Sequence, residues 1–515
     1  MNTSKTCNFS TLSWPRQWTL LSIVALFMAV GSTQASGTFP VSPSGGDDTA
    51  ALQQAFDDAV AAGPGSVVQL QSGDYCITAP VIVRGFDGDW VGAGRNKTFV
   101  RTCTAPAPFP VPAYIQADPA FPADPLLEII SPFVFLEIDG SPSINLSIAD
   151  MTIHLEGETN PWLAHGRPEP LTIFRPAILV AGARPSVVDG IVSSATLSVD
   201  GVELRANAEG FVFDMPSDSN IDNGIVVQGG VDGTIFETFD VEPVNATVSI
   251  TRSHFDRVAF SALQTPWCVD CDITVGGSKK MGNTFSLLYG APLFGSSIGM
   301  ASTVVVSHNM GEAQFGAVRW VALPVFFSTT PLAAPTEPSY IEVSKNKIDI
   351  FSHFINPSYG MYLDDYSLYF DTKAMQAYIH QNTIDQVDIG YGTEAFAGVL
   401  HLTGEDTLIQ NNKISGDFIL GGIVAGFAGP GAVGKNLLIK ANNLKGSTGG
   451  MAPIWLGPET SDSVVVGGPN KTQVLDEGTN NIITGVKKIE GNSPGQRIRE
   501  AVQTIHEFRD KAMMP

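Results

Sequence analysis

Four aligned segments mark the stretch from residue 341 to residue 446: IEVSKNKI (341–348), AYIHQNTI (377–384), TLIQNNKI (407–414) and LLIKANNL (437–444). Each segment alternates apolar and polar residues, which is typical of a strand with one buried side. Each then places an asparagine before one further apolar residue, and these asparagines are Asn346, Asn382, Asn412 and Asn442. We expect each asparagine to mark a sharp bend, because asparagine tolerates the left-handed backbone conformation and hydrogen-bonds locally.

The four asparagines are separated by 36, 30 and 30 residues. A nearly constant period of this size indicates stacked coils, each too small to bury its own apolar side. Because parallel strands need long returns, one strand, a bend and a second strand per coil predict a parallel β-helix. We expect the asparagines to form a structural ladder of amides that hydrogen-bond from coil to coil.

Weaker copies of the pattern precede this stretch, with bends at residues 151, 202, 253 and 309. The intervals up to Asn346 are 51, 51, 56 and 37 residues. The early coils therefore either carry long insertions or hide a weaker coil in each interval. Residues 104–125 are rich in proline, which predicts a long excursion and not a strand.

The segment GDDTAALQQAFDDAV (46–60) predicts a helix over 48–62 that covers the open end of the first coil. Asp48 or Thr49 can cap this helix, and Leu52, Phe56 and Val60 fall on one side of it. Together with GSVVQLQSGDY (65–75), it resembles the N-terminal part of pectate-lyase-like proteins with the pectin-lyase fold. The resemblance implies an all-β, right-handed parallel β-helix with short capping helices. That fold hosts lyases, hydrolases, epimerases, phage tailspikes and adhesins, so it does not by itself define a function.

The N-terminal residues are typical of a secretory signal peptide. Lys5 and Arg16 precede an apolar run over residues 19–31, and cleavage is expected near Ala35. We therefore expect a signal peptide at 1–35, a β-helix domain at 36–490 and an amphipathic C-terminal helix at 491–515. The mature protein would be secreted or periplasmic, with no membrane segment.

The formal net charge of −22 argues against nucleic acid as a partner and leaves a polysaccharide or surface glycan as the expected one. Four cysteines follow the signal peptide, an even set that predicts disulfides in an exported protein. Proximity in sequence favours Cys76–Cys103 and Cys268–Cys271. The alternatives are a redox Cys-x-x-Cys role for the second pair and a zinc site formed by all four cysteines.

The first candidate functional segment is the predicted loop 154–176. His165 and Arg167 are candidate catalytic residues, because a polysaccharide lyase needs a base and a cation that neutralises the uronate. Trp162 and Arg175 are candidate substrate-binding residues, and Glu156 and Glu158 are candidate calcium ligands. The alternative is a solvated loop with local ion pairs.

The second candidate segment is the predicted loop 352–373. Asp364, Asp365 and Asp371 could supply the acid and the base of glycoside hydrolysis, which needs two carboxylates. Tyr362 and Tyr366 could stack on sugar rings. The alternative is a loop that folds over the solenoid with its aromatic residues packed and its aspartates solvated.

The sequence therefore predicts a carbohydrate-active protein, either a polysaccharide lyase or a glycoside hydrolase, that acts in a groove along the β-helix. The alternative is a non-catalytic, extracellular glycan-binding or structural β-helix protein. The Asn-Thr-Asp, Gly-His-Gly and Arg-Ile-Lys motifs of polygalacturonase-like members do not occur, so no catalytic residue is carried over from the resemblance.

Overall fold

The structure is a computed structural model of the 515-residue chain. It describes residues 36–103, 131–136, 144–155, 175–182, 192–206, 222–230, 243–258, 261–298, 301–324, 337–352, 358–370, 373–390, 395–426, 433–467, 472–489 and 503. The predicted signal peptide, the proline-rich excursion and the predicted C-terminal helix lie outside these residues, apart from residue 503.

The strands stack into three faces. The first face consists of β1 (Thr38–Val41), β2 (Ser66–Leu70), β5 (Asp87–Val91), β8 (Ile144–Ala149), β11 (Ser193–Asp200), β14 (Val244–Thr251), β17 (Asp272–Gly276), β20 (Thr303–Ser307), β23 (Ser339–Ser344), β27 (Met375–His380), β31 (Leu408–Gln410), β34 (Leu438–Lys440), β38 (Val464–Val466) and β40 (Ile482–Thr484). The second face consists of β3 (Gly73–Ile77), β6 (Thr98–Thr102), β9 (Thr152–His154), β12 (Glu203–Arg205), β15 (His254–Asp256), β18 (Thr284–Leu288), β21 (Met310–Ala313), β24 (Lys347–Ile350), β28 (Thr383–Gln386), the first part of β32 (Lys413–Ala425) and β35 (Asn443–Thr448).

The third face consists of β4 (Val81–Arg84), β7 (Phe133–Leu136), β10 (Arg175–Gly182), β13 (Asp222–Gly230), β16 (Ser261–Cys268), β19 (Ala291–Ile298), β22 (Val318–Leu323), β25 (Ser358–Tyr359), β26 (Met361–Asp365), β29 (Ala395–His401), the rest of β32, β36 (Ile454–Leu456), β39 (Gln473–Asp476) and β41 (Lys487–Ile489). A small sheet of β30 (Gly404–Glu405), β33 (Gly434–Lys435) and β37 (Thr460–Ser461) lies at one corner, and a short 3-10 helix, η2, spans Tyr366–Phe370.

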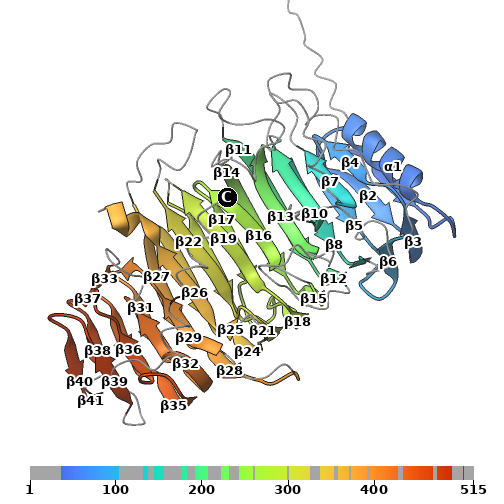
Figure 1. Ribbon diagram of the computed structural model, residues 1–515. Coiled ribbons are helices and arrows are strands. Elements are labelled where there is room, and N and C mark those ends of the chain that lie inside the picture. Colours follow the sequence, from blue (N-terminus) through green and yellow to red (C-terminus); the bar gives the residue numbers. More distant parts are fainter. Residues whose placement is uncertain are drawn as a thin grey trace, which may run out of the picture. The chain divides into compact units, whose positions relative to one another are not determined.

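Each strand pairs in parallel with the equivalent strand of the next coil (Figure 1). A single register runs along the first face, for example from Ile341 to Ala377. The described chain is therefore a right-handed parallel β-helix, and the predicted fold class is confirmed.

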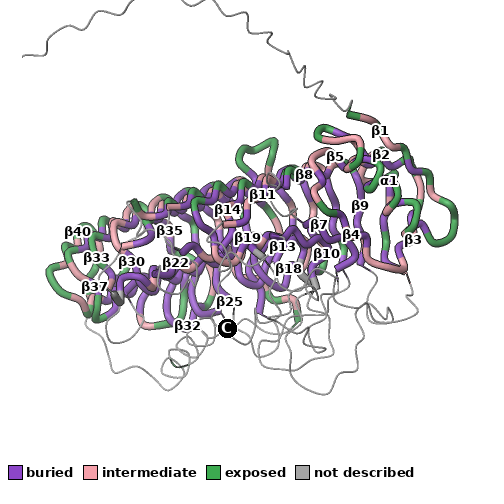
Figure 2. The backbone as a smooth tube through the Cα atoms, turned by 90° about the horizontal axis from the view of Figure 1, so that it is seen from above, coloured by how far each residue is buried: buried purple, intermediate pink, exposed green. Residues whose placement is uncertain are grey.

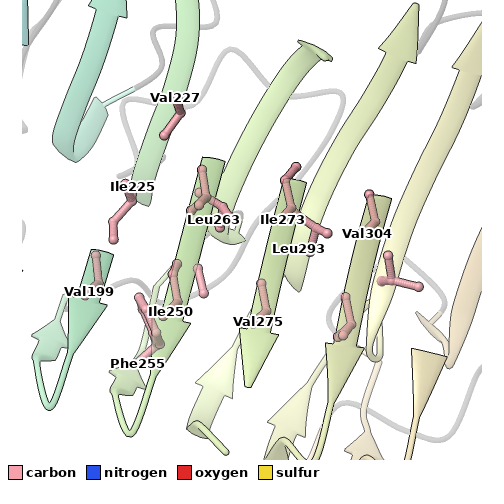
Figure 3. Close-up of a cluster of buried hydrophobic side chains, with 14 of the residues drawn as sticks. Val199, Ile225, Val227, Ile250, Phe255, Leu263, Ile273, Val275, Leu293 and Val304 are labelled. Atoms are coloured by element: carbon pink, nitrogen blue, oxygen red, sulfur yellow. The ribbon is translucent and has the colours of Figure 1, made fainter. Parts of the chain in front are cut away.

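The core lies inside the three faces. Val199 of the first face, Ile225 of the third and Phe255 of the second all point into it (Figure 3), and each is 1% exposed or less. Inward residues alternate with outward ones, because successive side chains of a strand point to opposite sides. Most residues of the strands are buried, while exposed residues gather at the turns and at both ends of the described solenoid (Figure 2).

Helix α1 (Thr49–Ala62) packs against the first coils, as predicted. Its Phe56 makes edge-to-face contacts with Phe86 at 5.3 Å and with Trp90 at 5.7 Å. The N-cap position is Asp48, but its carboxylate makes no cap hydrogen bond and instead accepts hydrogen bonds from the backbone nitrogens of Ser44 and Cys76. No helix among the described residues has the length and apolarity required to cross a membrane.

The asparagine ladder forms as predicted and is longer than expected. Each amide donates through Nδ2 to the Oδ1 of the next asparagine at 3.0 Å, in the order Asn283, Asn309, Asn346, Asn382, Asn412 and Asn442. The side chains lie at the corner between the first and second faces and are no more than 4% exposed. The column ties six consecutive coils together.

The expected backbone conformation of these asparagines is wrong. For the four asparagines predicted from the sequence, the left-handed residue is the one before: Lys345 has φ 56°, Gln381 57°, Asn411 55° and Ala441 54°. That residue makes the bend and points to solvent, while the asparagine turns inward. Asparagine therefore occupies these positions because its amide hydrogen-bonds along the ladder, and not because it tolerates a positive φ.

Both alternatives for the early coils occur. Residues 151 to 202 and 202 to 253 each span one coil, with long connections outside the described residues. The interval from 253 to 309 hides a coil, formed by β17, β18 and β19, with its ladder residue at Asn283.

The predicted disulfide Cys76–Cys103 is present and joins β3 to the residue after β6. The predicted disulfide Cys268–Cys271 is wrong, because both residues are free, buried thiols. Each thiol has its own backbone acceptor: Cys271 Sγ lies 3.3 Å from the carbonyl oxygen of Val244, and Cys268 Sγ lies 3.9 Å from that of Thr265.

Candidate functional site

Most of the first predicted site cannot be placed. Glu156, Glu158, Trp162, His165 and Arg167 lie outside the described residues, as does Asp371 of the second segment. Arg175 begins β10 on the third face, where only its backbone is described. In the described ranges, no group of three or more His, Cys, Asp or Glu side chains could hold a metal ion.

The second predicted segment is largely a strand and not a loop. Asp364 and Asp365 end β26, which pairs in parallel with β22 and β29. Met361 and Leu363 point into the core, whereas Tyr362 belongs to a cluster outside it. Asp364 therefore points outward with Tyr362, and Asp365 points inward. The two aspartates cannot serve as an acid and base pair on one side of the sheet.

Asp365 has a structural role at the corner that follows the third face. Its Oδ2 accepts hydrogen bonds from the backbone nitrogens of Ala374 (2.9 Å) and Met375 (2.8 Å), which begin the next strand of the first face. Burial raises the pKa of Asp365 to about 7, against the effect of these bonds. A catalytic role for Asp365 stays a prediction, and the structure places its carboxylate inside this corner and not on the outer side of the sheet.

A continuous outward row crosses the middle of the third face. The register aligns Gln264 of β16, Phe294 of β19, Arg319 of β22, Tyr362 of β26 and Leu400 of β29. The guanidinium carbon of Arg319 lies 4.3 Å from the centre of the Phe294 ring and 5.3 Å from that of Tyr362. Arg319 is only 4% exposed. A cation is thus held between two aromatic rings at the centre of this face.

A second outward row lies two residues further along the same strands and contains Ser296, Val321 and Asp364. Asp364 is diagonal to Arg319, at a separation that a long side chain can bridge. It is the only carboxylate on the outer side of β19, β22, β26 and β29. The site therefore combines one cation, one carboxylate and aromatic rings.

Two further aromatic rings extend the site, Tyr359 at the end of β25 and Phe315 between β21 and β22. Tyr359 lies 5.6 Å from Tyr362 and stacks on Phe315 at 5.0 Å. Burial raises the pKa of Tyr359 to about 12, although the positive charge of Arg319 opposes this shift. Tyr359 therefore stays protonated and can only donate or accept a hydrogen bond at neutral pH.

A partly exposed aromatic rim borders the buried residues. Trp267, Phe294 and Tyr366 are each partly accessible. Trp267 has φ 60°, which is rare for a bulky side chain, and its backbone nitrogen donates to Ser296 Oγ at 3.0 Å. Strained backbone of this kind concentrates at binding and catalytic sites. Tyr362 lies among the buried residues of this face and Tyr366 on the rim, and their role in binding sugar rings stays a prediction.

The sequence did not single out Phe294, Arg319 or Trp267 for this site. The alternation in VRWVAL (318–323) could have indicated Arg319, because it places Arg319 and Val321 on one side of a strand and Trp320 on the other. Trp320 is fully buried in the core. The register between distant strands, however, cannot be read from the alternation alone.

No protein-family model matches the sequence, and no curated protein matches it. Several solved structures are similar to the chain. The A-module of mannuronan C-5 epimerase AlgE4 from Azotobacter vinelandii is 14% identical, with a TM-score of 0.39, over 87% of this chain and 94% of that chain. The catalytic unit of a GH87 α-1,3-glucanase from Streptomyces thermodiastaticus is 14% identical, with a TM-score of 0.38, over 89% of this chain and 69% of that one.

The surface adhesin PfbA from Streptococcus pneumoniae is 10% identical, with a TM-score of 0.29, over 87% of this chain and 96% of that chain. These three proteins differ in what they do. Identities and TM-scores this low do not define the chemistry of this chain.

Proposed function

We propose that this protein is a secreted polysaccharide lyase that acts on a uronate-containing glycan across the outer side of the third face. The observation that carries the proposal is Arg319, a cation fixed between Phe294 and Tyr362 at the centre of that face. A uronate bears its carboxylate next to the carbon that loses a proton. A fixed guanidinium neutralises that carboxylate and stabilises the charge that develops on it.

The reaction assigned to the site is a β-elimination. A base removes the C5 proton, the bond between C4 and the glycosidic oxygen breaks, a C4–C5 double bond forms, and the leaving oxygen takes a proton. Asp364 is the proposed base and the Tyr362 hydroxyl the proposed proton donor. Both lie on the outer side of β26, beside Arg319. The partly exposed rings of Trp267 and Tyr366 would stack on the neighbouring sugar rings.

The same geometry disfavours glycoside hydrolysis by these residues. Hydrolysis needs two carboxylates about 5 to 10 Å apart on either side of the bond. The outer side of β19, β22, β26 and β29 carries a single carboxylate, that of Asp364, because Asp365 points inward. A lyase needs one general base and a cation, which matches the residues present.

The test is product formation on polygalacturonate, alginate and hyaluronan, each with and without calcium. Ultraviolet absorbance of an unsaturated uronate, together with new reducing ends, supports the lyase. Reducing ends without that absorbance contradict it. Asp364→Asn and Arg319→Ala should each lower kcat/KM at least about 100-fold, whereas Arg101→Ala on the second face should not.

Non-catalytic glycan binding is the second candidate. The proposed catalytic side chains are buried, since Asp364 is 0% exposed and Arg319 is 4% exposed. The aromatic rim beside them is partly exposed, which favours binding of a glycan by the rim over catalysis. A protein that binds a polyuronate, forms no product on any of the three, and loses binding in Trp267→Ala would be a binding protein.

A further inference from the structure

A second group of aromatic and polar side chains lies on the outer side of the first face. It consists of Tyr340 and Glu342 of β23, Gln376, Tyr378 and His380 of β27, and Gln410 of β31, and we call it the aromatic patch. The inward neighbours Ile341, Val343 and Ile379 are fully buried. The outer side chains are therefore not needed to fill the core of these coils.

The aromatic patch follows a row of small hydroxyl side chains on the same face. Along one register line the outward residues are Ser147, Ser198, Ser249 and Thr274 on β8, β11, β14 and β17. The same line then passes through Val305 and reaches Glu342 and Tyr378. Beyond Tyr378 the line continues through Leu408 of β31 and Leu438 of β34, so the aromatic patch lies between small hydroxyl side chains and aliphatic ones.

Contacts between its members hold the aromatic patch in one arrangement. The rings of Tyr378 and His380 stack with their centres 4.0 Å apart and 20° between their planes. His380 Nε2 lies 3.1 Å from Glu342 Oε1, and Gln410 Nε2 donates to the Tyr378 hydroxyl. Tyr340, at the edge, is 38% exposed. Side chains that are ordered before binding lose less entropy when a ligand arrives.

The chemistry of the aromatic patch selects an uncharged ligand with hydroxyl groups. Aromatic faces accept the apolar side of a sugar ring, and the carboxylate and amides can bond its hydroxyls. Glu342 and the net charge of −22 repel a polyanion. We propose that the outer side of β23, β27 and β31 binds a neutral polysaccharide, at a site separate from the third face.

Affinity gel electrophoresis tests this proposal with soluble β-glucan, xylan and galactomannan as probes. We expect at least one of the three to retard the wild-type protein. Tyr378→Ala should weaken that retardation at least about tenfold, as expected for removal of a central aromatic anchor. Tyr378→Phe should keep most of it, since the ring remains and only the hydroxyl is lost.

Thr274→Ala, on the same face but outside the aromatic patch, and Arg319→Ala on the third face are the controls, and both should bind like the wild type. The proposal is overturned if none of the three probes binds, if Tyr378→Ala binds as the wild type does, or if Arg319→Ala loses the same binding. Far-UV circular dichroism of each variant verifies its fold. None of these results depends on lyase activity, so the two proposals fail separately.

Discussion

The side-chain nitrogen of Asn346 and its backbone nitrogen both lie 3.0 Å from the same atom, Oδ1 of Asn382. One carbonyl oxygen thus accepts two hydrogen bonds from the preceding coil, and this geometry repeats along the ladder. These buried amides therefore link successive coils in a fixed register.

Replacing Asn346 by alanine should therefore be strongly destabilising. It removes the bonds to Asn382 and to the carbonyl oxygen of Val306, and leaves Asn309 without its acceptor. We expect a loss of about 3 kcal/mol or more in the free energy of unfolding, because buried groups lose their partners. Lys347→Ala, one residue later and exposed, should change it by less than about 0.5 kcal/mol. Chemical denaturation measures both, and equal effects would contradict a structural ladder.

The residue before each of the last five ladder asparagines has a positive φ, which strains any residue except glycine. Ala441 has φ 54°, a conformation that costs an alanine about 1 kcal/mol or more. Ala441→Gly should therefore raise the midpoint of denaturation, although glycine normally destabilises folded proteins. Ala93→Gly, exposed and without positive φ, should lower it slightly. The same sign for both variants would be inconsistent with the left-handed bend.

Gly404 is expected to tolerate no side chain. A Cβ atom there would lie 1.7 Å from Cε1 of the buried His401 ring. Gly404→Ala should lower the melting temperature clearly, because the ring cannot move without losing its 2.8 Å contact with Thr407 Oγ1. Gly46→Ala, where the nearest atom is 3.8 Å away, should be nearly neutral.

Two buried groups near the same corner should have opposite effects on stability as pH changes. The pKa of Asp365 is raised from 3.8 to about 7, so the folded state binds the extra proton in that range and stability falls as pH rises. The pKa of His401 is lowered from 6.5 to about 4, so the unfolded state binds the extra proton and stability rises with pH. Between about pH 4 and 6.5 the two effects nearly cancel.

Single substitutions should separate these effects. Asp365→Asn should become more stable as pH rises from 4 to 6.5, and His401→Gln less stable, each by roughly 1.4 kcal/mol per pH unit. Thermal unfolding of both variants and of the wild type across this range measures the slopes. Parallel curves for the three proteins would contradict the assigned burial.

Thiol titration tests the free cysteines. Denatured protein that lacks residues 1–35 should react with two equivalents of a thiol reagent before reduction and four after it, because only Cys76 and Cys103 are paired. The folded protein should react slowly, since Cys268 and Cys271 are buried. No reactive thiol before reduction would show that the second pair is oxidised.

The fold could be predicted because its signals are local. Apolar and polar residues alternate within segments of eight residues, and these segments recur with a period near 30 residues. The ladder asparagines mark both patterns in the sequence. The site could not be predicted from the sequence. Phe294, Arg319 and Tyr362 come together only through the register of three coils whose connections differ in length. Asp364 and Asp365 also suggested a loop, since aspartate is rare in strands. The neighbouring coils override that preference by pairing both sides of β26.

The most direct test of the central claim is a crystal structure of the Asp364→Asn protein with a uronate oligosaccharide. We expect a sugar carboxylate within hydrogen-bonding distance of Arg319, with rings against Phe294 and Trp267. An oligosaccharide bound elsewhere, with the outer side of β19, β22 and β26 empty, would contradict the proposed site.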